Sequence, residues 1–127
     1  MRIGLLEDNP SICDMLQEAL ELAGHHVSFY DKPTSLLATI TQERLPSSST
    51  GFDLLIIDLL LPETISGLQV IHYVKKLYPN LPVILISAAS RVQIEAALED
   101  VPDVQAFRKP FKISDLLAAM QVHTPAP

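Results

Sequence analysis

Short apolar runs alternate along the whole chain with segments that repeat apolar residues at helical spacing. The apolar runs are rich in branched aliphatic side chains and are bounded by Gly, Pro, Asn and Asp, a combination typical of β-strands. The pattern occurs five times, and it predicts strands over residues 2–6, 26–30, 53–57, 82–87 and 104–107.

The segments between these strands predict helices. Pro10 suits a first helical turn and Gly24 suits a helix C-terminus, so the first helix is expected between them. The others are expected over residues 34–44, 67–78, 91–99 and 112–121.

Strand and helix in strict alternation predict an α/β fold with a parallel sheet covered by helices on both faces. The run "PVILI" is apolar throughout and "DLLII" is apolar after its first residue, as expected for strands buried on both sides. In such sheets the ligand site lies at the carboxyl ends of the strands, so the residues that follow each strand carry the functional information.

Composition and charge narrow the class of function. The chain has 127 residues, 48% of them hydrophobic and 19% charged, which fits one globular domain. A formal net charge of −6 argues against binding to nucleic acid or to an anionic membrane surface. No apolar run approaches the length of a membrane span. The single cysteine permits no internal disulfide, so we expect a cytoplasmic protein.

Polar residues follow four of the predicted strands and should meet at one edge of the sheet. Glu7 and Asp8 follow the first strand, Asp58 the third, Ser87 ends the fourth, and Lys109 follows the fifth. Each alone has a simpler explanation, such as a solvated loop, a helix cap or a turn. Together, each at the end of its strand, they predict a site.

The chemistry of this set is coherent. Crowded carboxylates repel one another, and a hard divalent cation with oxygen ligands, such as Mg²⁺, relieves that repulsion. A lysine ammonium can steady a carboxylate or a phosphoryl oxygen, and a serine hydroxyl can hydrogen-bond to the same oxygen. Asp58, in the middle of the group, could then attack phosphorus as a nucleophile.

With these residues in place, the chain resembles the receiver domain of two-component response regulators, the CheY-like family. The resemblance is carried by "IGLLEDNP", "FDLLIIDLLLP", "PVILISA" and "FRKPF", and it covers nearly the whole chain. It implies a flavodoxin-like doubly wound fold with strand order 2-1-3-4-5. It also implies a phosphorelay protein that acts as a signalling domain while catalysing its own phosphoryl transfer and dephosphorylation.

The resemblance assigns a role to each acidic residue. Asp58 would be the phosphoacceptor and also a ligand of Mg²⁺. Asp8 would be a direct ligand, and Glu7 would act through water. The backbone carbonyl of Leu60 would complete the protein ligands.

The remaining motif residues contact the phosphoryl group. By similarity, Ser87 and Lys109 would bind its oxygens. The family also commonly has a cis peptide bond at the Lys-Pro step, here Lys109-Pro110.

Two departures from the family pattern stand out. Receivers usually carry Tyr or Phe three residues before the lysine as a rotating switch, whereas Ala106 occupies that position and Phe107 follows it. Either the aromatic switch is lost and Phe107 packs in the core, or the fifth strand is shifted by one residue, which would turn Phe107 to the other face. The loop "PETISG" is also one residue longer than usual.

The leading hypothesis is a phosphorylation-controlled switch. A histidine kinase or phosphotransfer protein would supply the phosphoryl group, and the change would reach a downstream protein or a fused output domain. The fourth helix, fifth strand and fifth helix would form the partner surface, and could also support a dimer. The hypothesis places the receiver domain at residues 1–122, and residues 123–127 form a frayed tail or linker stub.

Two alternatives stay open at this point. One is an interaction module that keeps the scaffold and signals without phosphorylation, which the altered fifth strand would favour. The other is a small metal-dependent phosphatase or phosphotransferase that acts on free metabolites.

Overall fold

The computed structural model describes residues 1–42, 51–58, 67–101 and 103–122. Its strands form one sheet and are all parallel. They are β1 (Arg2–Leu6), β2 (His26–Tyr30), β3 (Leu54–Asp58), β4 (Val83–Ser87) and β5 (Gln105–Arg108).

A helix follows each strand along the chain. The helices are α1 (Pro10–Leu22), α2 (Pro33–Gln42), α3 (Gly67–Leu77), α4 (Arg91–Ala97) and α5 (Ile113–Gln121). The strand order is β2-β1-β3-β4-β5, which confirms the predicted α/β doubly wound fold.

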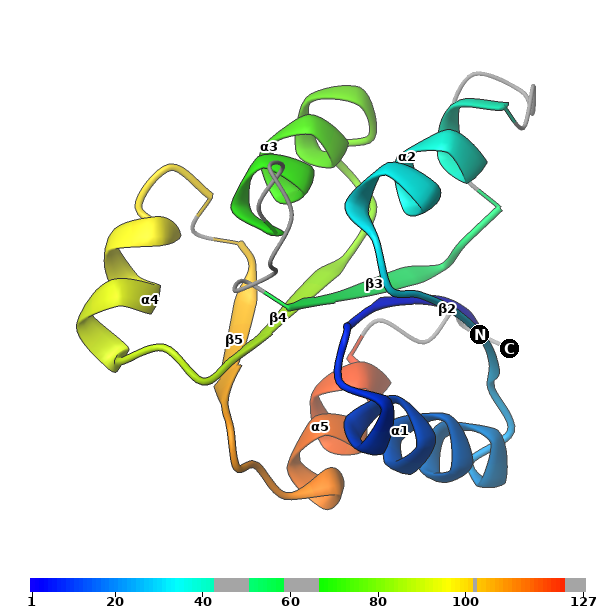
Figure 1. The fold of residues 1–127 in the computed structure, drawn as a ribbon. Coiled ribbons are helices and arrows are strands. Elements are labelled where there is room, and N and C mark those ends of the chain that lie inside the picture. Colours follow the sequence, from blue (N-terminus) through cyan, green and yellow to red (C-terminus); the bar gives the residue numbers. More distant parts are fainter. Residues whose placement is uncertain (43–50, 59–66, 102, 123–127) are drawn as a thin grey trace.

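The helices form a layer on each face of the sheet (Figure 1). On one side α2, α3 and α4 cover a core built from aliphatic residues of the central strands and of these helices. On the other side α1 and α5 cover a second core. Every residue of β3 and β4 is buried, because helices cover both faces of these central strands.

Alternation along each strand divides its side chains between the two cores. In β3, Leu55 and Ile57 face the core under α2 and α3, whereas Leu54 and Ile56 face the core under α1 and α5. Asp58 comes next in this alternation, at the last position of the strand. The same strand that anchors both cores therefore delivers a carboxylate to the edge of the sheet.

Element boundaries differ from the prediction by small shifts. The strand predicted over residues 104–107 runs from Gln105 to Arg108, because Val104 closes a turn onto the carbonyl of Val101 and pairing with β4 starts at Gln105. The helix predicted to end at residue 99 ends at Ala97, because the backbone of Leu98 leaves the helical conformation. The second helix begins one residue earlier than predicted, at Pro33, and residues 43–44 of the predicted helix lie outside the described residues.

Across the described part of the chain, the helices are all too short or too polar to traverse a lipid bilayer.

Candidate functional site

The acidic pair lies in the connection between β1 and α1. The backbone N–H of Glu7 donates to the carbonyl of Tyr30 (3.0 Å), which extends the pairing of β1 with β2 past the end of the strand. Asn9 then caps α1, because its Oδ1 accepts from the backbone N–H groups of Ser11 (3.0 Å) and Ile12 (3.3 Å). Glu7 and Asp8 are thus held between a strand end and a capped helix.

Asp58 and Ser87 end the next two strands of the sheet. Both residues are buried. Asp58 pairs with Ile86, the residue before Ser87, so Asp58 and Ser87 occupy neighbouring positions at one edge of the sheet. A buried carboxylate needs compensating partners, and the structure provides one from β5.

Lys109 is that partner. Its backbone N–H donates to the carbonyl of Ser87 (2.7 Å), which fixes where the side chain starts. Its Nζ lies 2.5 Å from Oε1 of Glu7 and 3.1 Å from Oδ2 of Asp58. The ammonium therefore bridges the acid from β1 and the acid from β3, and the Lys109-Pro110 peptide bond that follows is cis.

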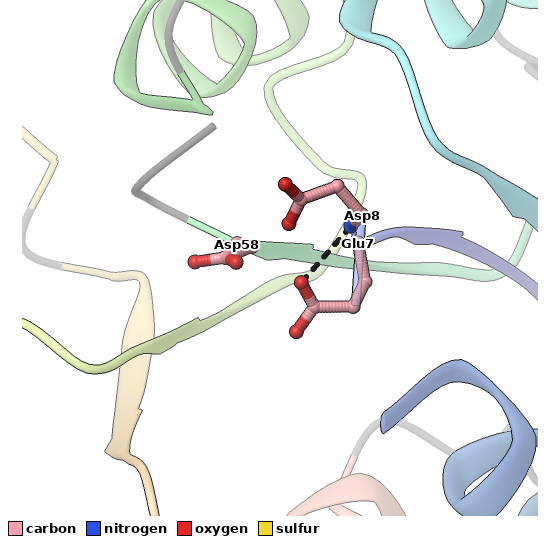
Figure 2. A group of neighbouring side chains, drawn as sticks. All are labelled: Glu7, Asp8 and Asp58. Atoms are coloured by element: carbon pink, nitrogen blue, oxygen red, sulfur yellow. Dashed lines mark hydrogen bonds between the residues drawn. The ribbon is translucent and has the colours of Figure 1, made fainter. Parts of the chain in front are cut away.

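The carboxylates of Glu7, Asp8 and Asp58 form a cluster (Figure 2). One oxygen from each lies within 4.8 Å of the others, and no other metal-ligating group of this kind occurs among the described residues. Glu7 is fully buried, while Asp8 is exposed, so the cluster opens to solvent on the Asp8 side. An all-oxygen donor set with net negative charge suits a hard divalent cation such as Mg²⁺.

The two oxygens of Glu7 have protein partners. Oε1 pairs with Lys109, and Oε2 accepts from the backbone N–H groups of Asp8 (3.0 Å) and Asn9 (3.4 Å). Glu7 is therefore a less available ligand than Asp8.

Burial and like charge act on the protonation of this site. Burial raises the pKa of Glu7, and the neighbouring Asp58 raises it further, against the opposing effect of Lys109. For Lys109, burial alone would lower the pKa, but the hydrogen bonds and charges of Glu7 and Asp58 together outweigh it and raise the pKa. Lys109 is therefore held as a cation.

Strand β5 has the unshifted geometry. Ala106 pairs with Leu85 and contacts the core beneath α3 and α4, whereas Phe107 contacts the opposite core and lies 6.2 Å from the ring of Phe111. Phe107 therefore does not take the place of an aromatic residue at position 106. Beside Ala106, between α4, β5 and α5, there is a hollow of about 600 Å³ lined in part by Arg91, Arg108 and Lys112.

Some expected features lie outside the described residues. These are the carbonyl of Leu60, residues 62–66 of the loop "PETISG", and the tail over residues 123–127. Their roles stay predictions.

The structure also shows contacts that the sequence reasoning missed. Arg108 donates from Nε to the carbonyl of Ala89 (3.2 Å), and Cys13 donates from Sγ to the carbonyl of Glu7 (3.3 Å). The cap at Asn9 had a visible signal, since an Asn directly before a Pro at the start of a helix is typical of that position. The Arg108 contact had none, because it joins residues 19 positions apart through a flexible side chain.

Comparison with known proteins identifies the family. The family model of the response regulator receiver domain matches residues 3–121. The chain belongs to this family. It is a receiver domain, a signalling domain of two-component systems, in which receivers act with kinases and output domains. The interaction module without phosphorylation is not favoured by these matches.

Similar proteins include both single receivers and longer regulators. The receiver domain is 28% identical to the response regulator receiver protein CpdR of Brucella abortus over 116 residues, which is 91% of this chain and 90% of that protein. It is 30% identical to the swarming motility regulation protein RssB of Serratia marcescens over 95% of this chain and 52% of that protein. It spans about half the length of this and other regulators, several of them named as transcriptional regulators.

Solved structures agree with the fold of the receiver domain. The chemotaxis protein CheY4 of Vibrio cholerae superposes with a TM-score of 0.80, at 22% identity, over 97% of this chain and 98% of that one.

Proposed function

We propose that this receiver domain is a phosphorylation-controlled switch that takes a phosphoryl group onto Asp58 from the phosphohistidine of a histidine kinase or phosphotransfer protein. The observation that carries the proposal is the position of Lys109, whose ammonium contacts both Glu7 and Asp58 at the carboxyl edge of the sheet. Asp58 is a buried carboxylate compensated by Lys109, and it belongs to an acidic cluster that is open to solvent at Asp8, which supports this chemistry.

Asp58 supplies the nucleophile. A carboxylate oxygen forms a bond to phosphorus while the bond between phosphorus and the imidazole nitrogen of the donor breaks, and its electron pair stays on that nitrogen. The product is an acyl phosphate on Asp58 and an imidazole on the donor, which leaves as the neutral ring because its other nitrogen carries a proton during the transfer. Water attack on the same phosphorus would end the signal, so the domain would catalyse both steps and still act as a signalling domain.

Asp8 and Asp58 would hold Mg²⁺ directly, Glu7 would do so through water, and the carbonyl of Leu60 would complete the protein ligands. The cation would offset the charge of the phosphoryl oxygens as they approach the carboxylates. The oxygen donors within 4.8 Å of one another support this assignment.

Lys109 and Ser87 would bind the new oxygens. Lys109 already compensates Asp58, and a phosphoryl group, with its greater charge, would draw the ammonium away from Glu7. Ser87 has one hydroxyl proton to donate. Ser87 ends β4 and Lys109 directly follows β5, so their adjustment would reach the surface formed by α4, β5 and α5.

That surface would serve the downstream protein, a fused output domain or a phosphorylation-dependent dimer. With Ala106 in place of an aromatic residue, the coupling would run through the backbone between β4 and α4. The receiver domain would extend over residues 1–122, and the cytoplasmic location expected from the sequence is part of this proposal.

Phosphorylation with a small donor tests the assignment of Asp58. After incubation with acetyl phosphate and Mg²⁺, intact mass should show one added phosphoryl group on the wild type and none on Asp58→Asn. The matched control Asp100→Asn changes an exposed aspartate in the same way and should be phosphorylated normally.

Three results would contradict the proposal. Incorporation that persists in Asp58→Asn would assign the acceptor elsewhere. No incorporation into the wild type, from acetyl phosphate or from a panel of phosphohistidine proteins, would reject the switch. Steady release of phosphate from small esters would favour a metabolite phosphatase.

A further inference from the structure

Two hydrogen bonds connect Ser87 to Arg108 through a single residue. The backbone N–H of Ala89 donates to Oγ of Ser87 (3.0 Å), and the carbonyl of the same residue accepts from Nε of Arg108 (3.2 Å). Ser87 is fully buried and Ala89 is 4% exposed, whereas Arg108 is an exposed residue of β5. A buried hydroxyl at the phosphoryl site is thus tied to a guanidinium on the surface.

The first of these bonds orients the hydroxyl of Ser87. A hydroxyl has one proton to donate and two lone pairs that accept. Because the N–H of Ala89 occupies an acceptor position, the proton of Ser87 cannot point toward that N–H and is directed elsewhere. A donor that is already oriented needs no rearrangement when an oxyanion arrives.

The second bond, from Arg108, holds Ala89 in the position from which its N–H can donate to Ser87. The segment from Ala88 to Ser90 joins β4 to α4 and has no strand partner of its own. On the far side of Ala89 the backbone is anchored by a capping box, in which Ser90 and Gln93 bond to each other's backbone N–H. On the near side, the carbonyl of Ala89 depends on Arg108.

From these contacts we infer that Arg108 is a positioning residue for phosphoryl binding. It acts through Ala89, whose carbonyl it fixes and whose N–H keeps the hydroxyl of Ser87 turned toward the phosphoryl oxygens. The inference rests on the proposed function, since it assigns a further residue to the same site. Arg108 itself does not touch the phosphoryl group.

The test compares Arg108→Met with Arg91→Met. Arg108→Met keeps a long side chain but removes the donor. Arg91 lines the same hollow, so Arg91→Met makes the same change of charge on the same face without touching Ala89. Arg108→Lys restores a charged donor and serves as the rescue variant. A thermal unfolding measurement on each variant checks that it is folded.

Beryllofluoride with Mg²⁺ is the probe, since it forms a stable mimic of an acyl phosphate on an aspartate. NMR titration gives its dissociation constant, and amide exchange of Ala89 without the probe reports the first hydrogen bond. In Arg108→Met we expect affinity for beryllofluoride and protection of the Ala89 amide each to fall about 2- to 10-fold, the size of one hydrogen bond. Arg91→Met should match the wild type, and Arg108→Lys should recover part of both losses.

Salt separates the hydrogen bond from a general effect of charge. At about 1 M salt the screening length is near 3 Å, so a long-range contribution of the guanidinium disappears while a direct bond remains. Persistence of both losses in Arg108→Met at high salt supports the inference.

Wild-type values in Arg108→Met, equal losses in Arg91→Met, or losses that vanish at high salt would each overturn the role of Arg108 and leave the proposed function intact. A wild type that neither binds beryllofluoride nor accepts a phosphoryl group would overturn both.

Discussion

At the scale of single residues, Lys109 determines whether the site tolerates its own charge. Its ammonium is shared between the carboxylates of Glu7 and Asp58, both of them buried, and its own side chain is 17% exposed. Removal of one member of a buried ion pair leaves the other charge without compensation, which costs far more than the pair contributes when intact.

Lys109→Met should therefore lower the free energy of unfolding by about 3 kcal/mol at neutral pH in the presence of a chelator. Urea unfolding measures the loss. In Asp58→Asn, which removes one of the two charges, the same Lys109→Met change should cost clearly less. Equal losses in the two backgrounds would mean that Lys109 stabilises the fold through packing and not through its charge.

Sequence predicted the members of this site but not their pairing. Glu7, Asp8, Asp58, Ser87 and Lys109 were found because parallel strands bring their carboxyl ends to one edge, which depends only on element order. That Lys109 bonds to Glu7 as well as to Asp58 depends on how two side chains 102 positions apart extend toward each other, and no local pattern records this.

At the scale of elements, α4 depends on its cap. It is 7 residues long, too short to be stable by itself, and Ser90 caps it. Oγ of Ser90 accepts from the N–H of Gln93 (3.2 Å), and the side chain of Gln93 returns a bond to the N–H of Ser90 (3.0 Å).

Ser90→Ala should lower the free energy of unfolding by about 1 kcal/mol and speed amide exchange in the first turn of α4, because it removes the acceptor for that turn. Ser90→Asp retains an acceptor and should stay close to the wild type. Urea unfolding and NMR exchange check both variants. If exchange in α4 stays unchanged in Ser90→Ala, packing of Ile94 and not the cap holds the helix.

The elements also show where sequence patterns stop being informative. The bounds of strands β1 and β2 were predicted to the residue, because an acidic residue, Glu7 or Asp31, directly follows each of them. The bounds of β5 were predicted one residue too early, because Val104 is a residue typical of strands but is buried in a turn. An apolar residue at the boundary of a strand can be buried either in the strand or in the turn beside it, and tertiary contacts decide between the two.

At the scale of the whole molecule, one ion pair joins parts of the chain that the sheet does not connect directly. Lys75 of α3 contacts Asp103, which precedes β5, at 2.7 Å, and it also donates to the carbonyl of Leu81 (2.9 Å). The hydrogen bond from Lys75 holds the pKa of Asp103 below its ordinary value.

This pair makes a pH-dependent contribution to stability. Because the pKa of Asp103 is lower in the folded than in the unfolded chain, the contribution is complete above the unfolded value of 3.8 and is lost as pH falls through the lower folded value. Asp103→Asn should lower the free energy of unfolding by no more than about 1 kcal/mol at pH 7, since Asp103 is largely exposed.

Urea unfolding of Asp103→Asn and wild type across pH 2 to 7 measures the effect. The difference should close in strong acid and shrink in high salt. A difference that stays constant with pH would assign the effect to geometry at Asp103 and not to its charge.

The link from Ser87 through Ala89 to Arg108 has a consequence for partners. Coupling between two binding sites is reciprocal. If phosphoryl binding changes the affinity of a partner for the Arg108 guanidinium, that partner changes the affinity of the site for the phosphoryl group by the same factor. A protein whose acidic side chain pulls Arg108 off the carbonyl of Ala89 would loosen the hydroxyl that steadies the acyl phosphate. Such a partner would lower the affinity of the site for a phosphoryl group, and a kinase or target that does not contact Arg108 would leave that affinity unchanged.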